Sequence, residues 1–357
     1  MSFNPVVATL LDSKRKTSAR DMKAAIVNEF GKSLSVEDVP APEPAPGQVL
    51  VKIEACGVCE IDLHSVDGDW AIKPPLPFIP GHEGVGIVTA LGRGVKAVKE
   101  GDCVGVPWLH TACGHCRDCI QGLEALCIHQ KNTGYSVNGG FAEYAVADPN
   151  FVIRIPDSLD FPVAAPILCG GVKAYCGLKG TRARRGETVV VIGTDSLGQL
   201  ALQYAKAMGM HVIAVDAAGT GLHAARTAGA ELTINAAGID PVIELQKIGG
   251  ADAVIATVAS PKSLSQGVKM LRPGGIMSIV GLPMNCKTSQ MFKSDVQNKT
   301  IRGSITGNRI DLQEALEFAA DGKVKPNFTT DSLKNINRIF DQIRAGTSVG
   351  YTVLQIA

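Results

Sequence analysis

From about residue 187 onward, short apolar runs alternate with helical patterns, and this alternation constrains the fold more than any other feature of the chain. The run E-T-V-V-V-I at 187–192 is typical of a buried strand. It is followed at 197–209 by L-G-Q-L-A-L-Q-Y-A-K-A-M-G, whose apolar residues recur at helical spacing. The segments H-V-I-A-V-D, A-D-A-V-I-A-T-V and G-G-I-M-S-I-V-G-L continue the series of strands. Strands that alternate with helices predict an α/β fold with a doubly wound parallel sheet.

The preceding part of the chain has a different texture. Short apolar runs are separated by Pro and Gly, as in A-P-E-P-A-P-G-Q-V-L-V-K-I, which is typical of strands and turns. We therefore expect a β-rich domain over 22–170, a nucleotide-binding domain over 171–309 and a C-terminal segment over 310–357. Residues 1–21 are expected to be an N-terminal extension. A mitochondrial targeting segment is the alternative, which Asp12 and the shortness of the apolar run disfavour.

The composition excludes several classes of partner. The 357 residues include 35 Lys and Arg against 34 Asp and Glu, with no long basic block. Neither nucleic acid nor an anionic membrane is therefore expected as a partner. No apolar run approaches the roughly 18 residues of a membrane span. With no secretory pattern at the N-terminus, we expect a cytoplasmic protein whose ten cysteines serve metal binding more than disulfides.

The strongest local motif is C-G-H-C-R-D-C, followed by seven residues and another cysteine. Four thiolates on a short lobe can close a tetrahedral shell that leaves no open position. The spacing therefore predicts a structural zinc site that holds the lobe folded and does no chemistry. Its ligands are Cys113, Cys116, Cys119 and Cys127. Four buried free cysteines are the less favoured alternative.

Three further segments carry residues that commonly bind metals: C-G-V-C-E-I-D-L-H at 56–64, G-H-E-G at 81–84 and L-C-G-G at 168–171. Each is a weak signal by itself, because a single His or Cys often only packs. With the cysteine lobe and the stretches P-I-L-C-G-G, Q-Y-A-K-A-M-G and G-N-R-I-D, the chain resembles the zinc-dependent alcohol dehydrogenases of the medium-chain dehydrogenase/reductase family. The resemblance is closest to the fungal and bacterial tetrameric type and covers nearly the whole chain from Met22.

The resemblance implies a GroES-like catalytic domain, to which the C-terminal segment returns, and a Rossmann domain. It also implies a catalytic zinc ion held by Cys59, His82 and Cys169, which makes two zinc ions per subunit. Glu83 matches a carboxylate that can approach this zinc or replace a ligand. Asp62 matches the carboxylate that orients the ligand histidine. A zinc ion with three protein ligands and one open position is a Lewis acid.

The resemblance also assigns positions to substrate and cofactor. Four positions match walls of a pocket for a small-molecule substrate: Trp70, Trp108, Ile61 and Leu282. Five positions match the cofactor loop and its surroundings: Gly193, Asp195, Gly198, Asp216 and Arg309. Asp216 follows the loop by about 20 residues, where an acid binds the adenosine ribose and favours NAD over NADP. A homotetramer is expected by the same resemblance.

Three positions depart from the family pattern. Residue 60 is usually His or Arg and contacts the cofactor pyrophosphate, whereas this chain has Glu60. Residue 61 is usually Ser or Thr, which passes a proton from the alcohol through the cofactor ribose to the position of His64. Ile61 cannot carry that proton. Asp195 stands at the middle glycine of G-x-G-x-x-G, where the backbone approaches the pyrophosphate.

These departures make NAD(H) doubtful as a cofactor. A carboxylate about 4 Å from a phosphate charge costs about 4 kcal/mol at an effective dielectric constant near 20. Glu60 and Asp195 together would then reduce the affinity by several powers of ten. Asp195 is also expected to cap the helix that starts near Leu197.

Two hypotheses of different class follow. The departures favour redox-neutral zinc chemistry without NAD, of the aldol, isomerase, lyase or hydrolase type, with Glu60, Glu83 or His64 as the acid or base. The alternative is an NAD(H)-dependent alcohol dehydrogenase or carbonyl reductase with an altered proton relay. A pseudoenzyme kept for binding is a third hypothesis, which the complete set of zinc ligands disfavours.

Overall fold

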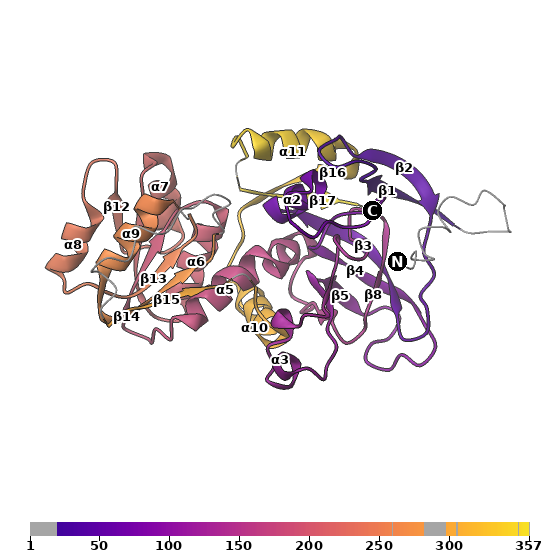
Figure 1. Ribbon diagram of the computed structural model, residues 1–357, viewed down its shortest axis with the longest axis horizontal. Coiled ribbons are helices and arrows are strands. Elements are labelled where there is room, and N and C mark those ends of the chain that lie inside the picture. Colours follow the sequence, from indigo (N-terminus) through magenta and orange to yellow (C-terminus); the bar gives the residue numbers. More distant parts are fainter. Residues whose placement is uncertain (1–19, 259, 282–297, 305, 349, 357) are drawn as a thin grey trace. The chain divides into compact units, whose positions relative to one another are not determined.

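The computed structural model describes residues 20–258, 260–281, 298–304, 306–348 and 350–356, and the structural statements below refer to these. The chain divides into two compact units (Figure 1). Unit 1 comprises the residues up to Cys169 together with the segment that starts at Phe328, and unit 2 comprises Gly170–Asn327. The return to unit 1 therefore begins at Phe328 and not at residue 310, the boundary expected from the sequence.

Unit 1 is built on a seven-stranded sheet in the order β16-β17-β3-β4-β5-β9, with β8 also paired to β3. Its strands are β3 (Val49–Val58), β4 (Gly84–Leu91), β5 (Cys103–Val106), β8 (Tyr144–Ala147), β9 (Ile153–Arg154), β16 (Phe328–Ser332) and β17 (Tyr351–Gln355). All its strand pairs are antiparallel except β16 with β17. Two smaller antiparallel pairs join β1 (Asp21–Ile26) to β2 (Ser35–Pro40) and β6 (Leu109–Thr111) to β7 (Lys131–Asn132).

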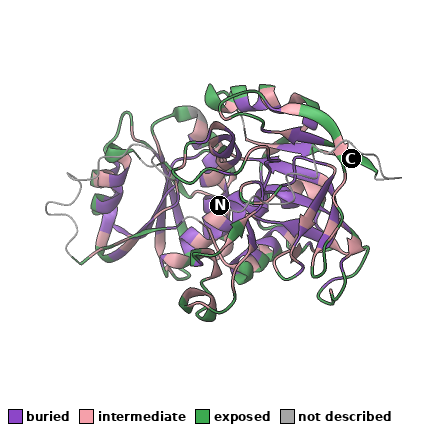
Figure 2. Cartoon of the chain, turned by 45° about the vertical axis from the view of Figure 1, so that its right-hand side comes forward, coloured by how far each residue is buried: buried purple, intermediate pink, exposed green. Residues whose placement is uncertain are grey.

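The core of unit 1 follows from the apolar alternation along its strands. In β3 the side chains of Val49, Val51 and Ile53 are fully buried, as expected when one face of a strand packs inward. Buried strands form much of this sheet (Figure 2): β3, β5 and β8 are mostly buried, whereas β16 is half-buried or exposed along its length. The helices of unit 1 are short: α2 (Glu60–Asp67), α3 (Arg117–Ile120), α4 (Phe161–Ala164), α11 (Ile336–Arg344) and the 3-10 turns η1 (Glu124–Leu126), η2 (Ala165–Leu168) and η4 (Leu333–Asn335).

Helix α2 directly follows β3 and carries much of the candidate site. The Asp62 carboxylate accepts a hydrogen bond of 3.0 Å from the backbone N–H of Cys59, the residue before the helix. This bond satisfies one of the backbone donors that a helix start leaves without a partner. The helix ends at Gly68, whose φ of 70° is the left-handed conformation that glycine adopts most readily.

Unit 2 contains a six-stranded parallel sheet in the order β12-β11-β10-β13-β14-β15. This is the 3-2-1-4-5-6 order of a Rossmann fold, and it confirms the predicted doubly wound sheet. The strands are β10 (Thr188–Ile192), β11 (His211–Asp216), β12 (Leu232–Asn235), β13 (Ala251–Ala256), β14 (Leu271–Ile279) and β15 (Thr300–Gly303). The helices are α5 (Gly170–Gly180), α6 (Ser196–Ala207), α7 (Gly219–Thr227), α8 (Pro241–Lys247), α9 (Pro261–Met270) and α10 (Arg309–Ala320).

The N-terminal extension and the membrane-spanning length of the helices were also considered from the sequence. Residues 1–19 of the expected N-terminal extension lie outside the described residues, and Asp21 already begins β1. Among the described residues, no single helix is both long enough and apolar enough to span a membrane. The bent pair Phe161–Leu168 and Gly170–Gly180 meets that criterion by length and composition alone.

Candidate active site and metal centres

The dispersed ligand residues come together in unit 1. The metal-binding atoms of Cys59, His82, Glu83 and Cys169 all lie within 4.8 Å of one another. The sulfur atoms of Cys59 and Cys169 are 4.0 Å apart. Two thiolates on one tetrahedral zinc ion, each about 2.3 Å from the metal, would lie about 3.8 Å apart. The two sulfur atoms are thus spaced for a shared metal ion.

Asp62 connects two of these residues. One of its carboxylate oxygens, Oδ1, lies 2.7 Å from Nδ1 of His82 and also accepts from the backbone N–H of Gly81 at 3.1 Å. The other oxygen accepts the bond from the N–H of Cys59. Because the carboxylate accepts from Nδ1, it fixes the imidazole so that Nε2 presents its lone pair to the cluster. Asp62 is 1% exposed and His82 is 0% exposed, so this pair is withdrawn from solvent.

The donor set suits zinc. Nε2 of His82 is buried and makes no hydrogen bond of ordinary geometry among the described residues. Such an atom is costly to bury unless it binds something. Two thiols, an imidazole and a carboxylate are the ligand types of zinc sites that keep a position for substrate. The residues present therefore fit a catalytic zinc ion, whose chemistry is that of a Lewis acid.

The four-cysteine lobe forms the second metal-binding group. The sulfur atoms of Cys113, Cys116, Cys119 and Cys127 also lie within 4.8 Å of one another, and those of Cys113 and Cys119 are 3.9 Å apart. The N–H of Cys116 donates to the sulfur of Cys113, and the N–H of Cys113 donates to the sulfur of Cys127. The backbone N–H of His115 lowers the pKa of the Cys113 thiol. All four ligands are sulfur, so the group fits a closed structural site.

Aromatic side chains lie beside the first group. The ring of Trp108 is 5.4 Å from the ring of His82, and Trp70 is 6.0 Å from Trp108. Tyr135 completes the cluster at 5.1 Å from Trp70 and 5.8 Å from Trp108. Both tryptophans were predicted from the family resemblance, but Tyr135 was not, because it lies in a turn with no periodic pattern. The three rings are an apolar surface next to the candidate zinc ligands.

The two atypical residues of unit 1 share the first turn of α2. Glu60 is exposed, and Ile61 is half-buried with its backbone carbonyl accepting from the hydroxyl of Ser65 at 2.8 Å. One turn further on, Nδ1 of His64 lies 2.7 Å from a carboxylate oxygen of Asp69. Ile61 is therefore next to a ligand residue, Cys59, at the position where the family has its hydroxyl.

In unit 2 the predicted cofactor loop joins β10 to α6. Gly193 has a φ of 94°, and a Cβ there would lie 2.5 Å from the hydroxyl oxygen of Thr257. A Cβ on Gly198 would lie 2.0 Å from the carbonyl oxygen of Gly193. These two glycines are thus required by the turn and by the close approach of helix to strand. Asp195 has an extended backbone, with φ −64° and ψ −173°, which any residue adopts.

The acidic side chains of Asp195 in this loop and of Asp216 at the end of β11 bind donors of the protein itself. Asp195 accepts from the backbone N–H of Gly198 at 2.9 Å, which confirms the expected helix cap. One oxygen of Asp216 accepts from the N–H of Thr194 at 2.7 Å and from its hydroxyl at 2.6 Å. The other oxygen of Asp216 accepts from the N–H of Ala218. The two glycines thus keep the tight turn of a Rossmann loop, and the Asp195 side chain lies against the start of α6.

The remaining predicted positions are more dispersed. Arg309 is exposed at the first position of α10, and Leu282 lies outside the described residues. Glu60 belongs to unit 1 and Asp195 to unit 2. That both oppose one pyrophosphate stays a prediction.

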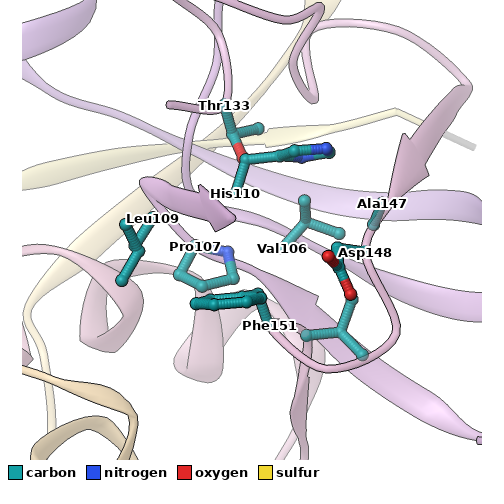
Figure 3. Close-up of a pocket in the computed structure, with 9 residues that line it drawn as sticks. Val106, Pro107, Leu109, His110, Thr133, Ala147, Asp148 and Phe151 are labelled. Atoms are coloured by element: carbon teal, nitrogen blue, oxygen red, sulfur yellow. The ribbon is translucent and has the colours of Figure 1, made fainter. Parts of the chain in front are cut away.

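A narrow pocket in unit 1 holds a buried histidine and includes none of the candidate zinc ligands (Figure 3). It is lined by Val106, Pro107, Leu109, His110, Thr133, Ala147, Asp148, Phe151 and Val152. Burial lowers the pKa of His110 to about 4, although Asp148 acts in the opposite direction. Nδ1 of His110 and the hydroxyl of Thr133 are buried without a hydrogen-bond partner among the described residues. The pocket has no space for the centre of a water molecule, so it is not a substrate site.

Comparison with known proteins assigns each unit to a known domain family. The family model for the alcohol dehydrogenase GroES-like domain matches residues 45–157, and the model for zinc-binding dehydrogenases matches residues 196–321. An alcohol dehydrogenase from Rhizobium meliloti (strain 1021) is 52% identical over 336 residues, which cover 94% of this chain and 99% of that protein. The chain belongs to the zinc-dependent alcohol dehydrogenases of the medium-chain dehydrogenase/reductase family.

Solved structures of this family agree. The alcohol dehydrogenase of the archaeon Aeropyrum pernix superposes with a TM-score of 0.81 at 30% identity, covering 93% of this chain and 99% of that one. The acetophenone reductase of Geotrichum candidum, solved in complex with NAD, superposes with a TM-score of 0.79 at 28% identity, covering 96% and 98%. The predicted GroES-like and Rossmann fold and the predicted family are therefore confirmed.

The comparisons change the functional preference drawn from the sequence. The chain is an enzyme of the alcohol dehydrogenase type, from a family that binds zinc and acts on small molecules. The preference for redox-neutral chemistry without NAD finds no support among the relatives. The alternative, an NAD(H)-dependent dehydrogenase or reductase, is better supported. The departures at Glu60, Ile61 and Asp195 thus need an explanation within alcohol dehydrogenase chemistry.

Proposed function

We propose that this chain is an NAD(H)-dependent alcohol dehydrogenase or carbonyl reductase that acts on a small alcohol or aldehyde and has an altered proton relay. The carrying observation is the group of Cys59, His82 and Cys169 in unit 1, arranged around one point with Asp62 behind two of them. The relatives named alcohol dehydrogenases add support. Zinc in this group would polarise the substrate oxygen, and the nicotinamide would exchange hydride with the substrate carbon.

The side chains of unit 1 would bind and orient the substrate. Trp70, Trp108 and Tyr135 offer an apolar surface that would hold the carbon skeleton and exclude water. This surface lies beside His82, so a substrate oxygen directed to the ligand group would place its carbon chain against the rings.

Proton transfer must follow a route other than the family's hydroxyl. Ile61 has no group that exchanges a proton. His64 donates from Nδ1 to the Asp69 carboxylate when neutral, so its Nε2 is the atom that would take up a proton. We propose that protons reach the substrate oxygen through water instead of through residue 61, with slower turnover as the consequence.

The test uses the purified full-length protein with zinc bound. NADH oxidation is followed at 340 nm with a series of aldehydes from acetaldehyde to benzaldehyde, and the alcohol product is identified by gas chromatography. Stoichiometric formation of alcohol and NAD is the expected result. Absence of alcohol at millimolar aldehyde and millimolar NADH, in protein shown to hold two zinc ions, would reject the proposed function.

Redox-neutral zinc chemistry is the second candidate because two substitutions disfavour dehydrogenase function. Ile61 lacks the hydroxyl that relays the proton, and Asp195 places a negative charge at the loop for the pyrophosphate. It predicts consumption of a carbonyl compound without any dinucleotide. The same aldehyde series without NADH, analysed by gas chromatography for condensation or dehydration products, separates the two candidates.

A homotetramer is proposed on the resemblance alone, and the cytoplasmic location expected from the sequence stays a prediction. Sedimentation velocity would test the assembly, and a mass near that of one 37.4 kDa chain would reject it.

A further inference from the structure

We propose that the Asp195 carboxylate is an internal anion at the start of α6, so that a dinucleotide binds only by displacing it from the backbone N–H of Gly198. The inference rests on the proposed function in one respect: it takes the ligand of the loop to be a nicotinamide dinucleotide. Asp195 would then set the affinity for the cofactor. Its side chain would have two positions, one bound to the N–H of Gly198 and one turned away from it.

The hydrogen bonds of the loop support this competition. The first backbone N–H groups of a helix have no partner within the helix and attract anions, which is why pyrophosphate binds there in Rossmann folds. In this chain Asp195 already takes the N–H of Gly198 at 2.9 Å and also acts on the N–H of Leu197. The hydroxyl of Thr257 lies 3.5 Å from the same carboxylate oxygen. The helix start therefore has an anion of its own.

A second acid, Asp216 at the end of β11, binds donors of the protein in the same manner. Asp216 holds the N–H and the hydroxyl of Thr194 with one oxygen and the N–H of Ala218 with the other. Thr194 and Asp195 are consecutive, so these bonds fix the loop on both sides of the turn. An adenosine ribose that binds Asp216 would have to share an oxygen that already accepts from Thr194 or Ala218.

The backbone and the exposure of Asp195 show that this arrangement can open. Its φ and ψ are extended, so the turn does not depend on which residue stands there. The residue is exposed, so a ligand can reach it and the carboxylate can swing towards solvent. The cost of Asp195 thus falls on the ligand and not on the fold.

The competition makes binding sensitive to pH. Although the residue as a whole is exposed, neighbouring atoms of the loop shield its carboxylate from water and so raise the pKa of Asp195; the N–H of Gly198 opposes this rise, and the charge of Asp216 adds to it. The neighbours from the other elements are the hydroxyl of Thr257 after β13 and the N–H groups of Leu197 and Gly198 in α6, all uncharged. A bound pyrophosphate would raise the pKa further, so binding should take up protons and tighten as the pH falls.

The experiment compares the full-length zinc-bound protein with Asp195→Asn and Asp195→Gly. Asparagine caps a helix as well as aspartate but carries no charge, whereas glycine removes the charge and the bulk at little cost to the helix. NADH binding is measured by fluorescence titration and by calorimetry in two buffers of different ionisation enthalpy, at pH 6 and pH 8. Asp240→Asn serves as the matched control, because Asp240 caps α8 in the same unit through the N–H of Val242.

At pH 8 we expect Asp195→Gly to bind NADH at least about tenfold more tightly than the wild type and Asp195→Asn to lie between them. The wild type should bind more tightly at pH 6 than at pH 8 and take up protons on binding. Both Asp195 variants should lose that proton uptake, and Asp240→Asn should behave as the wild type. Dissociation constants of the wild type and Asp195→Gly within twofold, or equal proton uptake in Asp195→Asn, would overturn the inference.

Failure of the proposed function gives a different result. If Asp195→Gly binds NADH more tightly but no form converts an aldehyde to an alcohol, the inference stands and the proposed function falls. If the wild type turns over aldehyde and binds NADH as tightly as Asp195→Gly, the proposed function stands and the inference falls. Absence of NADH binding by all forms would reject both.

Discussion

The candidate zinc site of unit 1 and the candidate cofactor loop of unit 2 use carboxylates in opposite ways. In unit 1, Asp62 accepts from Nδ1 of His82 and from the N–H of Cys59, and so directs both ligand residues towards the metal position. In unit 2, Asp195 accepts from Gly198, and so takes a donor that a ligand would need. Both carboxylates stabilise their local structure, but only the first leaves the binding atoms available. A retained motif therefore predicts binding only when its donors and acceptors are not used up by neighbouring residues.

Removal of a candidate zinc ligand in unit 1 should have the strongest effect on activity. Cys169→Ser should reduce the zinc content from two ions per chain to one and lower aldehyde reduction by at least about 1,000-fold, because the metal supplies several kcal/mol of charge stabilisation. Zinc is counted by mass spectrometry of the digested protein. Cys103→Ser, a thiol of unit 1 outside both metal-binding groups, should keep both ions and the activity. Two zinc ions in Cys169→Ser would show that the group around Cys59 is not the site.

Acid should destabilise unit 1 through His110. Its pKa is lowered by burial to about 4, against about 6.5 in the unfolded chain. Between these values the unfolded state binds the extra proton, so stability is complete above pH 6.5 and is lost as the pH falls towards 4. The free energy of unfolding should be about 2 kcal/mol lower at pH 5 than at pH 8 from this group alone.

Urea titrations of wild type and His110→Gln at both pH values measure this contribution. Metal loss affects both forms, so the difference between their pH responses isolates His110. His129→Gln, which changes an exposed histidine, is the control. An equal acid response in the wild type and His110→Gln would contradict the lowered pKa.

The sequence predicted the fold and the metal-binding groups to different depths, for physical reasons. The four cysteines of the lobe are close in sequence, so their spacing alone indicates a shared metal. Cys169 lies 110 residues after Cys59, and only the family resemblance joined them. The cap by Asp195 is a local interaction and was predicted. The bonds between Asp216 and Thr194 depend on the parallel register of β10 and β11, which no local pattern contains.

The position of α10 could not be predicted from the local pattern either. The helical pattern that starts near residue 310 was assigned to the C-terminal return, but α10 belongs to unit 2 and the return starts at Phe328. An amphipathic pattern tells that a helix buries one face but not which core receives it.

Asp62→Asn tests whether the zinc site of unit 1 depends on the orientation of its ligands as well as on their presence. The amide oxygen can still accept from His82 and Gly81, but the amide NH2 group cannot accept from the N–H of Cys59, and the negative charge beside the imidazole is lost. Zinc affinity or activity should fall by about 10- to 100-fold. Zinc dissociation is measured with a colorimetric chelator. Glu54→Gln, in β3 of the same unit and paired with Lys52, is the control. Unchanged zinc release in Asp62→Asn would reduce Asp62 to a helix cap.

Substitution of Ile61 should change activity least. Ile61→Thr introduces the hydroxyl that the family uses to pass protons, while Ile61→Val removes nearly the same volume without a hydroxyl. General acid and base steps contribute about 100- to 10,000-fold when fully formed, but here the proton would still have to continue past the new hydroxyl. We therefore expect kcat for aldehyde reduction to rise only about three- to tenfold in Ile61→Thr and to stay within twofold in Ile61→Val.

The rise should be largest at high pH, where protons from water are scarce, and this is measured as a pH profile of kcat at saturating NADH. If the threonine and valine variants have the same profile, the missing hydroxyl does not limit turnover, and Asp195 is left as the principal departure that affects the reaction.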